Sequence, residues 1–122
     1  MLSELETARL AAEAADNKKA FDIMVLDLRA LTYITDYFVL CSGSNITQVG
    51  AITDGIAQAL AQEGRHPSHV EGDAEASWVL MDYGDVVVHV FDEQTRLYYN
   101  LERLWGDAPR VPLPAAAGSV SS

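Results

Sequence analysis

The stretch SWVLMDYGDVVVHVF, residues 77–91, gives the clearest indication of the fold. Two short apolar runs lie on either side of Gly84, and both are rich in the β-branched and aromatic residues that favour strands. Because successive side chains of a strand point to opposite faces, Trp78, Leu80 and Asp82 are expected on one face. The sequence therefore predicts a β-hairpin with a glycine turn.

Further strands are predicted before this hairpin. The segment FDIMVLDLRAL (21–31) alternates in part between apolar and polar residues, whereas YFVLCSG (37–43) is more continuously apolar, as in a buried strand. The polar segment RHPSHVEGD (65–73) contains Pro67, which favours a position at the edge of a sheet. Together with the hairpin, these segments predict a mixed sheet of about five strands.

Helices are predicted on either side of these strands. Apolar residues between positions 45 and 64 recur at spacings of three and four, with Asn45 as N-cap and Gly64 at the C-terminal end. Residues 3–16 start with a capping box of Ser3 and Glu6. This Ala-rich helix offers little apolar area, so we expect it to pack loosely or against a partner. A short closing helix is predicted over 93–105.

The order of these elements predicts an α/β (α+β-like) fold, a mixed β-sheet flanked by helices. It differs from the strict strand-helix alternation of a doubly wound dinucleotide-binding fold. Residues 1–108 are expected to form a single domain. Residues 109–122 are rich in Pro, Ala, Gly and Ser without a periodic apolar face, which predicts a flexible C-terminal tail.

The charge of the chain favours some partners over others. Eighteen acidic residues against eight basic ones give a net charge of -10, and phosphate backbones repel such a molecule. The apolar runs are far shorter than a membrane span, and no basic segment followed by an apolar stretch begins the chain. The one cysteine, Cys41, lies in an apolar run, as a small buried hydrophobe would. We therefore expect a cytoplasmic protein that contacts neither membranes nor much RNA.

Enzymatic chemistry has one candidate motif. Gly43 and Ser44 follow a predicted strand and precede a helix, which is how nucleotidyltransferases begin their active site and where a phosphate can bind. Such enzymes also need closely spaced carboxylates for two metal ions, and the chain has no Asp-x-Asp pair. A capped strand-to-helix turn is the favoured interpretation.

Other polar residues of the chain also suggest structure more than catalysis. Asp82 and Asp85 flank the turn of the hairpin, where carboxylates accept hydrogen bonds from amides. His89 in the run VVVHVF is typical of a hydrogen-bonded histidine in a sheet, and His66 and His69 lack a third zinc ligand. We expect no catalytic residue, no metal and no cofactor.

Surface chemistry is the remaining possibility. Residues 66–95 contain seven acids and no Lys or Arg, which fits either a solvated face or a complement to a basic partner. Aromatic residues gather close by, between residues 78 and 105. Tyr and Trp are favoured at the centres of protein interfaces. Core packing would explain some of them. These residues are Trp78, Tyr83, Tyr98, Tyr99 and Trp105.

Several stretches together resemble one known family, the bacterial ribosomal silencing factors, also called the Iojap family. They are ITDYFVLCSGSNITQVGAI (34–52), VEG (70–72), WVLMDYGDVVVHVF (78–91) and RLYYNLERLWGDA (96–108). The resemblance implies a fold distantly similar to nucleotidyltransferases, without catalytic carboxylates or enzymatic activity. It also implies binding to the large (50S) ribosomal subunit through its protein fourteen. Bound there, such factors hinder joining of the small subunit and repress translation when nutrients are short.

The resemblance and the charge of the chain together suggest a docking site. An acidic factor should dock on a basic ribosomal protein more readily than on RNA. We expect Trp78 and Leu80 to be apolar anchors and Asp82 and Asp85 to pair with Lys or Arg. Three further aromatic or apolar residues complete the patch or pack beneath it, and Tyr83 lies at the turn. Those three are Tyr99, Leu101 and Trp105.

Other positions of the family pattern are expected to hold turns and caps. They are Asp36, Gly43, Ser44, Glu71, Gly72 and His89.

Three alternatives stay open from the sequence. One is a nucleotidyltransferase-like enzyme that binds nucleotides, and another is a factor for large-subunit assembly, as organelle relatives of the family are. The third is a homodimer, formed through the helix at 3–16 and an exposed face, that hides the docking residues when the protein is free.

Overall fold

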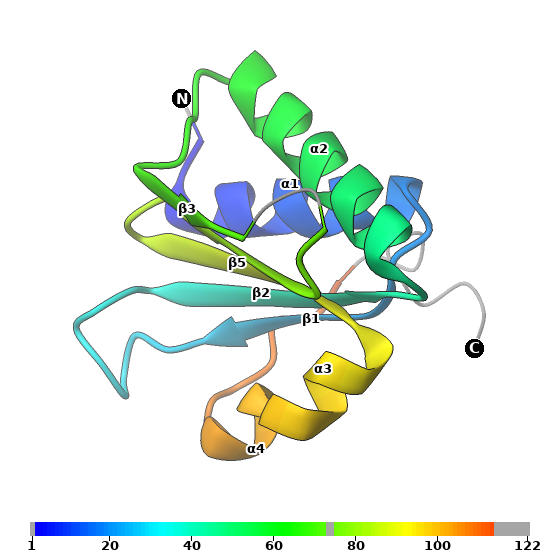
Figure 1. Ribbon diagram of the computed structural model, residues 1–122. Coiled ribbons are helices and arrows are strands. Elements are labelled where there is room, and N and C mark those ends of the chain that lie inside the picture. Colours follow the sequence, from blue (N-terminus) through cyan, green and yellow to red (C-terminus); the bar gives the residue numbers. More distant parts are fainter. Residues whose placement is uncertain (1, 73–74, 114–122) are drawn as a thin grey trace.

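The computed structural model describes residues 2–72 and 75–113. A five-stranded mixed sheet in the order β1-β2-β5-β4-β3 forms its middle layer (Figure 1). Strands β2 and β5 are parallel, and the other neighbouring pairs are antiparallel. The predicted fold class is confirmed. The strands are β1 (Phe21–Asp27), β2 (Tyr37–Gly43), β3 (His69–Glu71), β4 (Trp78–Asp82) and β5 (Val86–Asp92).

Helices α1 (Glu4–Asn17) and α2 (Ile46–Gln62) cover one face of this sheet (Figure 1). The capping box of α1 forms as predicted, since Ser3 Oγ accepts the amide of Glu6 and the Glu6 carboxylate accepts the amide of Ser3. The expectation that α1 packs loosely is wrong, because its small side chains let it lie close against α2 and the sheet. Its buried residues are Thr7, Ala8, Ala11, Ala12, Ala14 and Ala15. None of the helices in the described part of the chain is long and apolar enough to span a membrane.

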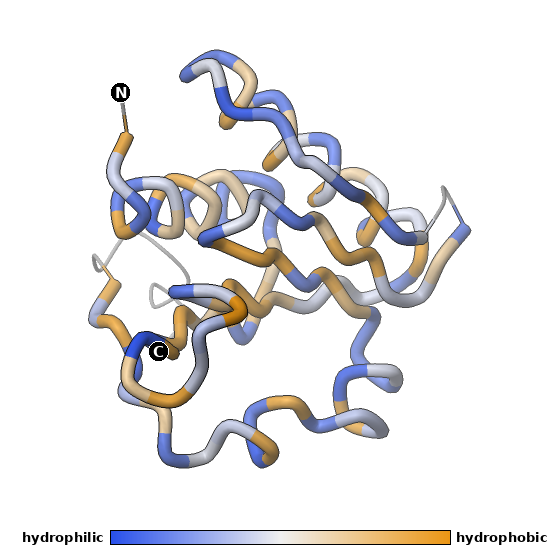
Figure 2. Tube along the Cα trace, turned by 90° about the vertical axis from the view of Figure 1, so that its left-hand side faces the viewer, coloured by the Kyte–Doolittle hydropathy of each residue, from blue (hydrophilic) through white to orange (hydrophobic). Residues whose placement is uncertain are grey.

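The two faces of the sheet carry separate apolar clusters, and Figure 2 shows stretches of hydrophobic residues, in orange, along the strands. Along β4, Val79 and Met81 are buried on the side of α1 and α2, whereas Trp78, Leu80 and Asp82 are half-buried on the other side. The alternation predicted for the hairpin is therefore confirmed. The smaller cluster, on the side of Trp78, is centred on the buried residues Leu26, Leu28, Leu40, Phe91 and Ala108.

The predicted closing helix is broken in two. Helix α3 (Glu93–Tyr99) ends at Asn100, whose φ of 48° is left-handed, and α4 (Leu101–Leu104) follows. Asparagine adopts this conformation more readily than most residues, so the chain can turn there without glycine. Both short helices lie against the second face of the sheet (Figure 1). The prediction of one continuous helix over 93–105 is therefore wrong.

The ends of β1 also differ from the predictions. The strand stops at Asp27 and not near residue 31, because the Asp27 carboxylate accepts both the backbone amide and the Nε–H of Arg29 and turns the chain. The flexible tail does not begin at residue 109. Pro109 accepts the amide of Asp27, and Val111 donates to Val25, both at 2.8 Å, so this segment adds to the edge of β1. The rest of the predicted tail, residues 114–122, lies outside the described residues.

Candidate protein-docking surface

The face of the sheet opposite α1 and α2 carries a connected set of aromatic rings, which we term the aromatic cluster. Trp78 lies within it, with ring centroids 4.7 Å from Tyr99 and 5.0 Å from Phe91. The cluster spans β2, β4, β5 and the two short helices, so residues distant in sequence meet there. Its members are Phe38, Trp78, His89, Phe91, Tyr99 and Trp105.

His89 lies within this cluster, almost fully buried. Its ring is 4.6 Å from Phe38 and 5.9 Å from Trp78, and its Nδ1 accepts the indole N–H of Trp78 at 3.1 Å. Burial lowers the pKa of His89 to about 4, so the imidazole is neutral at pH 7. His89 is therefore a hydrogen-bonded histidine in the sheet, as predicted.

Exposed apolar side chains extend the aromatic cluster outward over α3 and α4. Leu97, Tyr98 and Leu104 are each more than 70% exposed, and Tyr99 is 51% exposed. With Asn100 and Arg103 they line an open hollow of about 620 Å³. The ring of Tyr99 joins this area to Trp78, and Tyr98 lies 5.0 Å from Tyr99. Exposed apolar patches of this kind mark interaction sites in soluble proteins.

Leu97 and Leu104 were not among the predicted site residues. Their helical spacing supports only the prediction of a closing helix. In the structure the helix breaks at Asn100, and both side chains are exposed to solvent. The other predicted members of this segment, Leu101 and Trp105, are half-buried and pack into the smaller apolar cluster beneath the patch.

Acidic side chains flank Leu80 on the same face. The register pairs Glu71 of β3 with Leu80, and His69 with Asp82, so the side chains of each pair share a face. The Asp82 carboxylate accepts the amide of Gly84 at 2.7 Å, as predicted for a turn carboxylate. Glu71, predicted to hold a turn, is exposed instead. Its Oε2 lies within hydrogen-bond distance, 2.9 Å, of His69 Nε2.

Two predicted docking residues are engaged within the protein. Tyr83 is only 7% exposed, and its side chain belongs to the apolar cluster under α1 and α2. The Asp85 carboxylate is paired with Arg65 at 2.9 Å, and Arg65 also donates to Tyr83 O and to Thr7 Oγ1. The absence of Lys and Arg between residues 66 and 95 hid this pairing, because Arg65 lies just before that range and reaches the turn through the fold.

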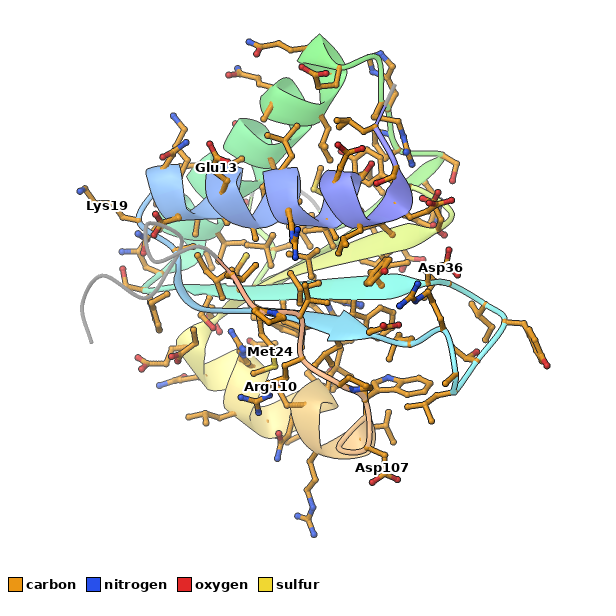
Figure 3. All side chains as sticks on the ribbon, turned by 180° about the vertical axis from the view of Figure 1, so that it is seen from behind. Glu13, Lys19, Met24, Asp36, Asp107 and Arg110 are labelled. Carbon is orange, nitrogen blue, oxygen red and sulfur yellow. The ribbon has the colours of Figure 1, made fainter. Side chains whose placement is uncertain are left out.

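The remaining family-pattern residues hold the backbone in place. A Cβ at Gly43 would lie 3.1 Å from the amide nitrogen of Val49, so glycine allows β2 to approach α2 closely. The amide and hydroxyl of Ser44 both donate to Gln48 Oε1, and Asn45 caps α2. Asp36, at the start of β2 (Figure 3), donates its amide to Asp85 O and accepts that of Leu28.

Gly72 directly follows β3, at the point where the chain turns away from its pairing with β4. Its φ is 101°, and a Cβ there would lie 2.8 Å from the carbonyl oxygen of Trp78.

The polar groups at the start of α2 are engaged within the protein, which favours the capped-turn interpretation of Gly43 and Ser44. Among the described residues, no three His, Cys, Asp or Glu side chains come together as metal ligands would.

A buried ion pair holds α3 and α4 against the sheet. Arg96 is 6% exposed, its Nη1 donates to Ser42 Oγ at 2.9 Å, and its Nε donates to Glu102 Oε2 at 3.1 Å. One strand and both short helices are thus joined through a single guanidinium. The exposed patch therefore lies on helices, α3 and α4, that are held to the sheet by hydrogen bonds of Arg96.

We use the term docking surface for the exposed patch, Trp78 and the acid-flanked Leu80 together. Its apolar members are Trp78, Leu80, Leu97, Tyr98, Tyr99 and Leu104, and its acidic edge is Glu71 and Asp82.

Comparisons with known proteins agree with the resemblance seen in the sequence. The model of a family described as "Ribosomal silencing factor during starvation" matches residues 2–121. Ribosomal silencing factor RsfS of Bacillus subtilis is 45% identical over 112 residues, which cover 92% of this chain and 95% of that protein. Protein Iojap of Zea mays chloroplasts is 39% identical over 84% of this chain and 45% of that protein.

Solved structures show the same fold. A crystal structure of a Chromobacterium violaceum protein superposes with a TM-score of 0.82 at 34% identity, covering 99% of this chain and 100% of that one. A Bacillus halodurans protein of 41% identity gives a TM-score of 0.75, with 85% of this chain and 94% of that one covered.

Proposed function

Because this chain belongs to the family of ribosomal silencing factors, we propose that it silences ribosomes by binding the large (50S) subunit and keeping the small subunit from joining it. The names of its relatives support a regulatory role on the ribosome. The binding site on the subunit and the steric mechanism are the proposed parts. Such an action represses translation in the cytoplasm under nutrient limitation, and it requires no chemical step.

The docking surface carries this proposal. It combines exposed aromatic and aliphatic side chains with acids at one edge, on a chain whose net charge is -10. Aromatic side chains supply much of the affinity at protein interfaces, and acids choose a basic partner and speed the encounter. Phosphate repulsion disfavours RNA as the main contact. A basic ribosomal protein, proposed here to be protein fourteen, fits this chemistry.

Tyr98 provides the sharpest test of this surface. Its side chain is 82% exposed, so Tyr98→Ala should leave the fold intact, and Tyr33→Ala is a matched control because Tyr33 is fully exposed in the loop between β1 and β2. We expect Tyr98→Ala to lower co-sedimentation with large subunits by about tenfold or more, the loss typical of an interface anchor. Tyr33→Ala should bind like the wild type. Equal binding of both variants would remove Tyr98 from the proposed surface.

Self-association is a second property to test. The apolar side of α1 is covered by α2 and the sheet, so it is not available for a homodimer formed through this helix. We propose that any homodimer of the free protein instead uses the docking surface, where exposed Leu97, Tyr98 and Leu104 offer apolar area. Sizing across a concentration series should then show a dimer that Tyr98→Ala weakens. A dimer unchanged by Tyr98→Ala would place its interface elsewhere.

A further inference from the structure

His89 has one satisfied and one unsatisfied ring nitrogen. Nδ1 accepts the indole N–H of Trp78 at 3.1 Å, whereas Nε2 is buried and has no hydrogen-bond partner among the described residues. A neutral imidazole whose Nδ1 accepts must carry its proton on Nε2. The buried side of the ring is therefore a donor without an acceptor, an arrangement that costs free energy.

An apolar ring at this position would avoid that cost. The neighbours of His89 include Phe38, with ring centroids 4.6 Å apart, and Phe91, at 6.0 Å, and a phenyl group could make similar contacts. Packing alone would therefore favour phenylalanine over histidine. What a phenyl ring cannot supply is the acceptor for the indole of Trp78.

We propose that His89 is a positioning residue, which fixes the orientation of the Trp78 indole within the docking surface without itself touching the partner. This inference rests on the proposed function, because it assumes that Trp78 is one of the docking anchors. With its N–H donated to His89, the half-buried Trp78 offers a partner apolar ring surface and no hydrogen-bond donor.

The other neighbours of Trp78 support the same role. Its ring is stacked on Phe91 at 5.0 Å with an interplanar angle of 29°, and it is tilted against Tyr99 at 4.7 Å. Contacts between rings allow a range of orientations, whereas a directed hydrogen bond selects one of them. An anchor held in its binding orientation loses less entropy when a partner docks.

Three variants separate positioning from packing. His89→Phe keeps an aromatic ring and removes the acceptor, and His89→Asn keeps an acceptor but loses the ring. Val88→Ala is the matched control, because Val88 is a fully buried residue next in β5 that faces α1 and α2. The first readout is the indole N–H resonance of Trp78 by NMR, assigned with Trp78→Phe. The second is affinity for large ribosomal subunits by co-sedimentation.

We expect His89→Phe to shift the Trp78 indole resonance and speed its hydrogen exchange, and to weaken subunit binding by about tenfold. His89→Asn and Val88→Ala should bind within about threefold of the wild type. Wild-type binding by His89→Phe would overturn the positioning role, as would equal losses in all three variants. If Trp78→Ala also leaves binding unchanged, the docking role of Trp78 fails with it. A loss with Trp78→Ala alone overturns only the role of His89.

Discussion

Replacement of Arg96 by Met tests how the docking surface is supported. The guanidinium is 6% exposed and joins Ser42 Oγ, at 2.9 Å, to Glu102 Oε2, at 3.1 Å. Met fills much of the space of the arginine stem but leaves Glu102 as a half-buried carboxylate without its cation. It also removes the partner of the Ser42 hydroxyl, which is 1% exposed.

The expected size of this effect follows from the burial of the pair. Breaking a buried ion pair by removing one partner costs about 3–5 kcal/mol. The Glu102 side chain keeps 25% exposure, so the lower end, about 3 kcal/mol, is expected. For a domain of this size that corresponds to a fall in Tm of roughly 10–20 °C. Adding Glu102→Gln to Arg96→Met removes the orphaned charge and should recover about 1–2 kcal/mol.

Urea unfolding followed by circular dichroism, on the wild type, both single variants and the double variant, measures the free energies, and thermal unfolding of the same proteins measures Tm. Binding should weaken as well, because α3 and α4 present Tyr98, Tyr99 and Leu104. A cost below about 1 kcal/mol for Arg96→Met, or simple additivity in the double variant, would refute the view that this pair anchors the two helices.

Three further predictions concern the sheet. Gly72→Ala, at a φ of 101° and with Trp78 O 2.8 Å from the new Cβ, should cost about 2 kcal/mol or more in thermal unfolding. Gly64→Ala, at a φ of 78° with nothing within 4 Å, should cost only about 1 kcal/mol, and equal costs would contradict the close approach. Burial lowers the pKa of His89 to about 4 in the folded protein, below the 6.5 expected when unfolded. As the pH falls, the unfolded chain therefore binds a proton at His89 before the folded protein does. The contribution of neutral His89 to the free energy of unfolding is complete above about pH 6.5 and is lost as the pH falls to about 4, a loss of roughly 3 kcal/mol in all. The difference in urea stability between wild type and His89→Phe should show this slope, and a pH-independent difference would contradict it. Burial raises the pKa of Cys41 to about 12, so Ellman's reagent should label it only after unfolding, and rapid labelling of the native protein would contradict its burial.

Local patterns predicted the sheet and its covering helices because short apolar runs mark the strands, and caps and spacings of three and four mark the helices. The alternation of β4 placed Trp78 and Leu80 on one face, and the capping box placed the start of α1. The turn at Asn100 escaped prediction because asparagine adopts a left-handed conformation without a distinct sequence signal. Arg65 escaped prediction because its partners lie in two distant segments, α1 and the turn between β4 and β5, that only the fold brings together.

The candidate site was predicted in part for the same reasons. Trp78 and Leu80 were identified as surface anchors, and the structure leaves both half-buried on the face that carries the docking surface. Tyr83 was placed at the surface because it adjoins the turn, but strand alternation carries its side chain to the opposite face, with Val79 and Met81. Leu97 and Leu104 could be recognised only once the helix break was known.

A subunit-joining assay tests the central claim most directly. Large ribosomal subunits are incubated with the purified protein, small subunits are added, and the products are separated on a sucrose gradient. The joined ribosome peak should fall as the protein is added, with the protein in the large-subunit peak, and Tyr98→Ala should have a much weaker effect. Normal joining by large subunits that carry the bound protein would contradict it.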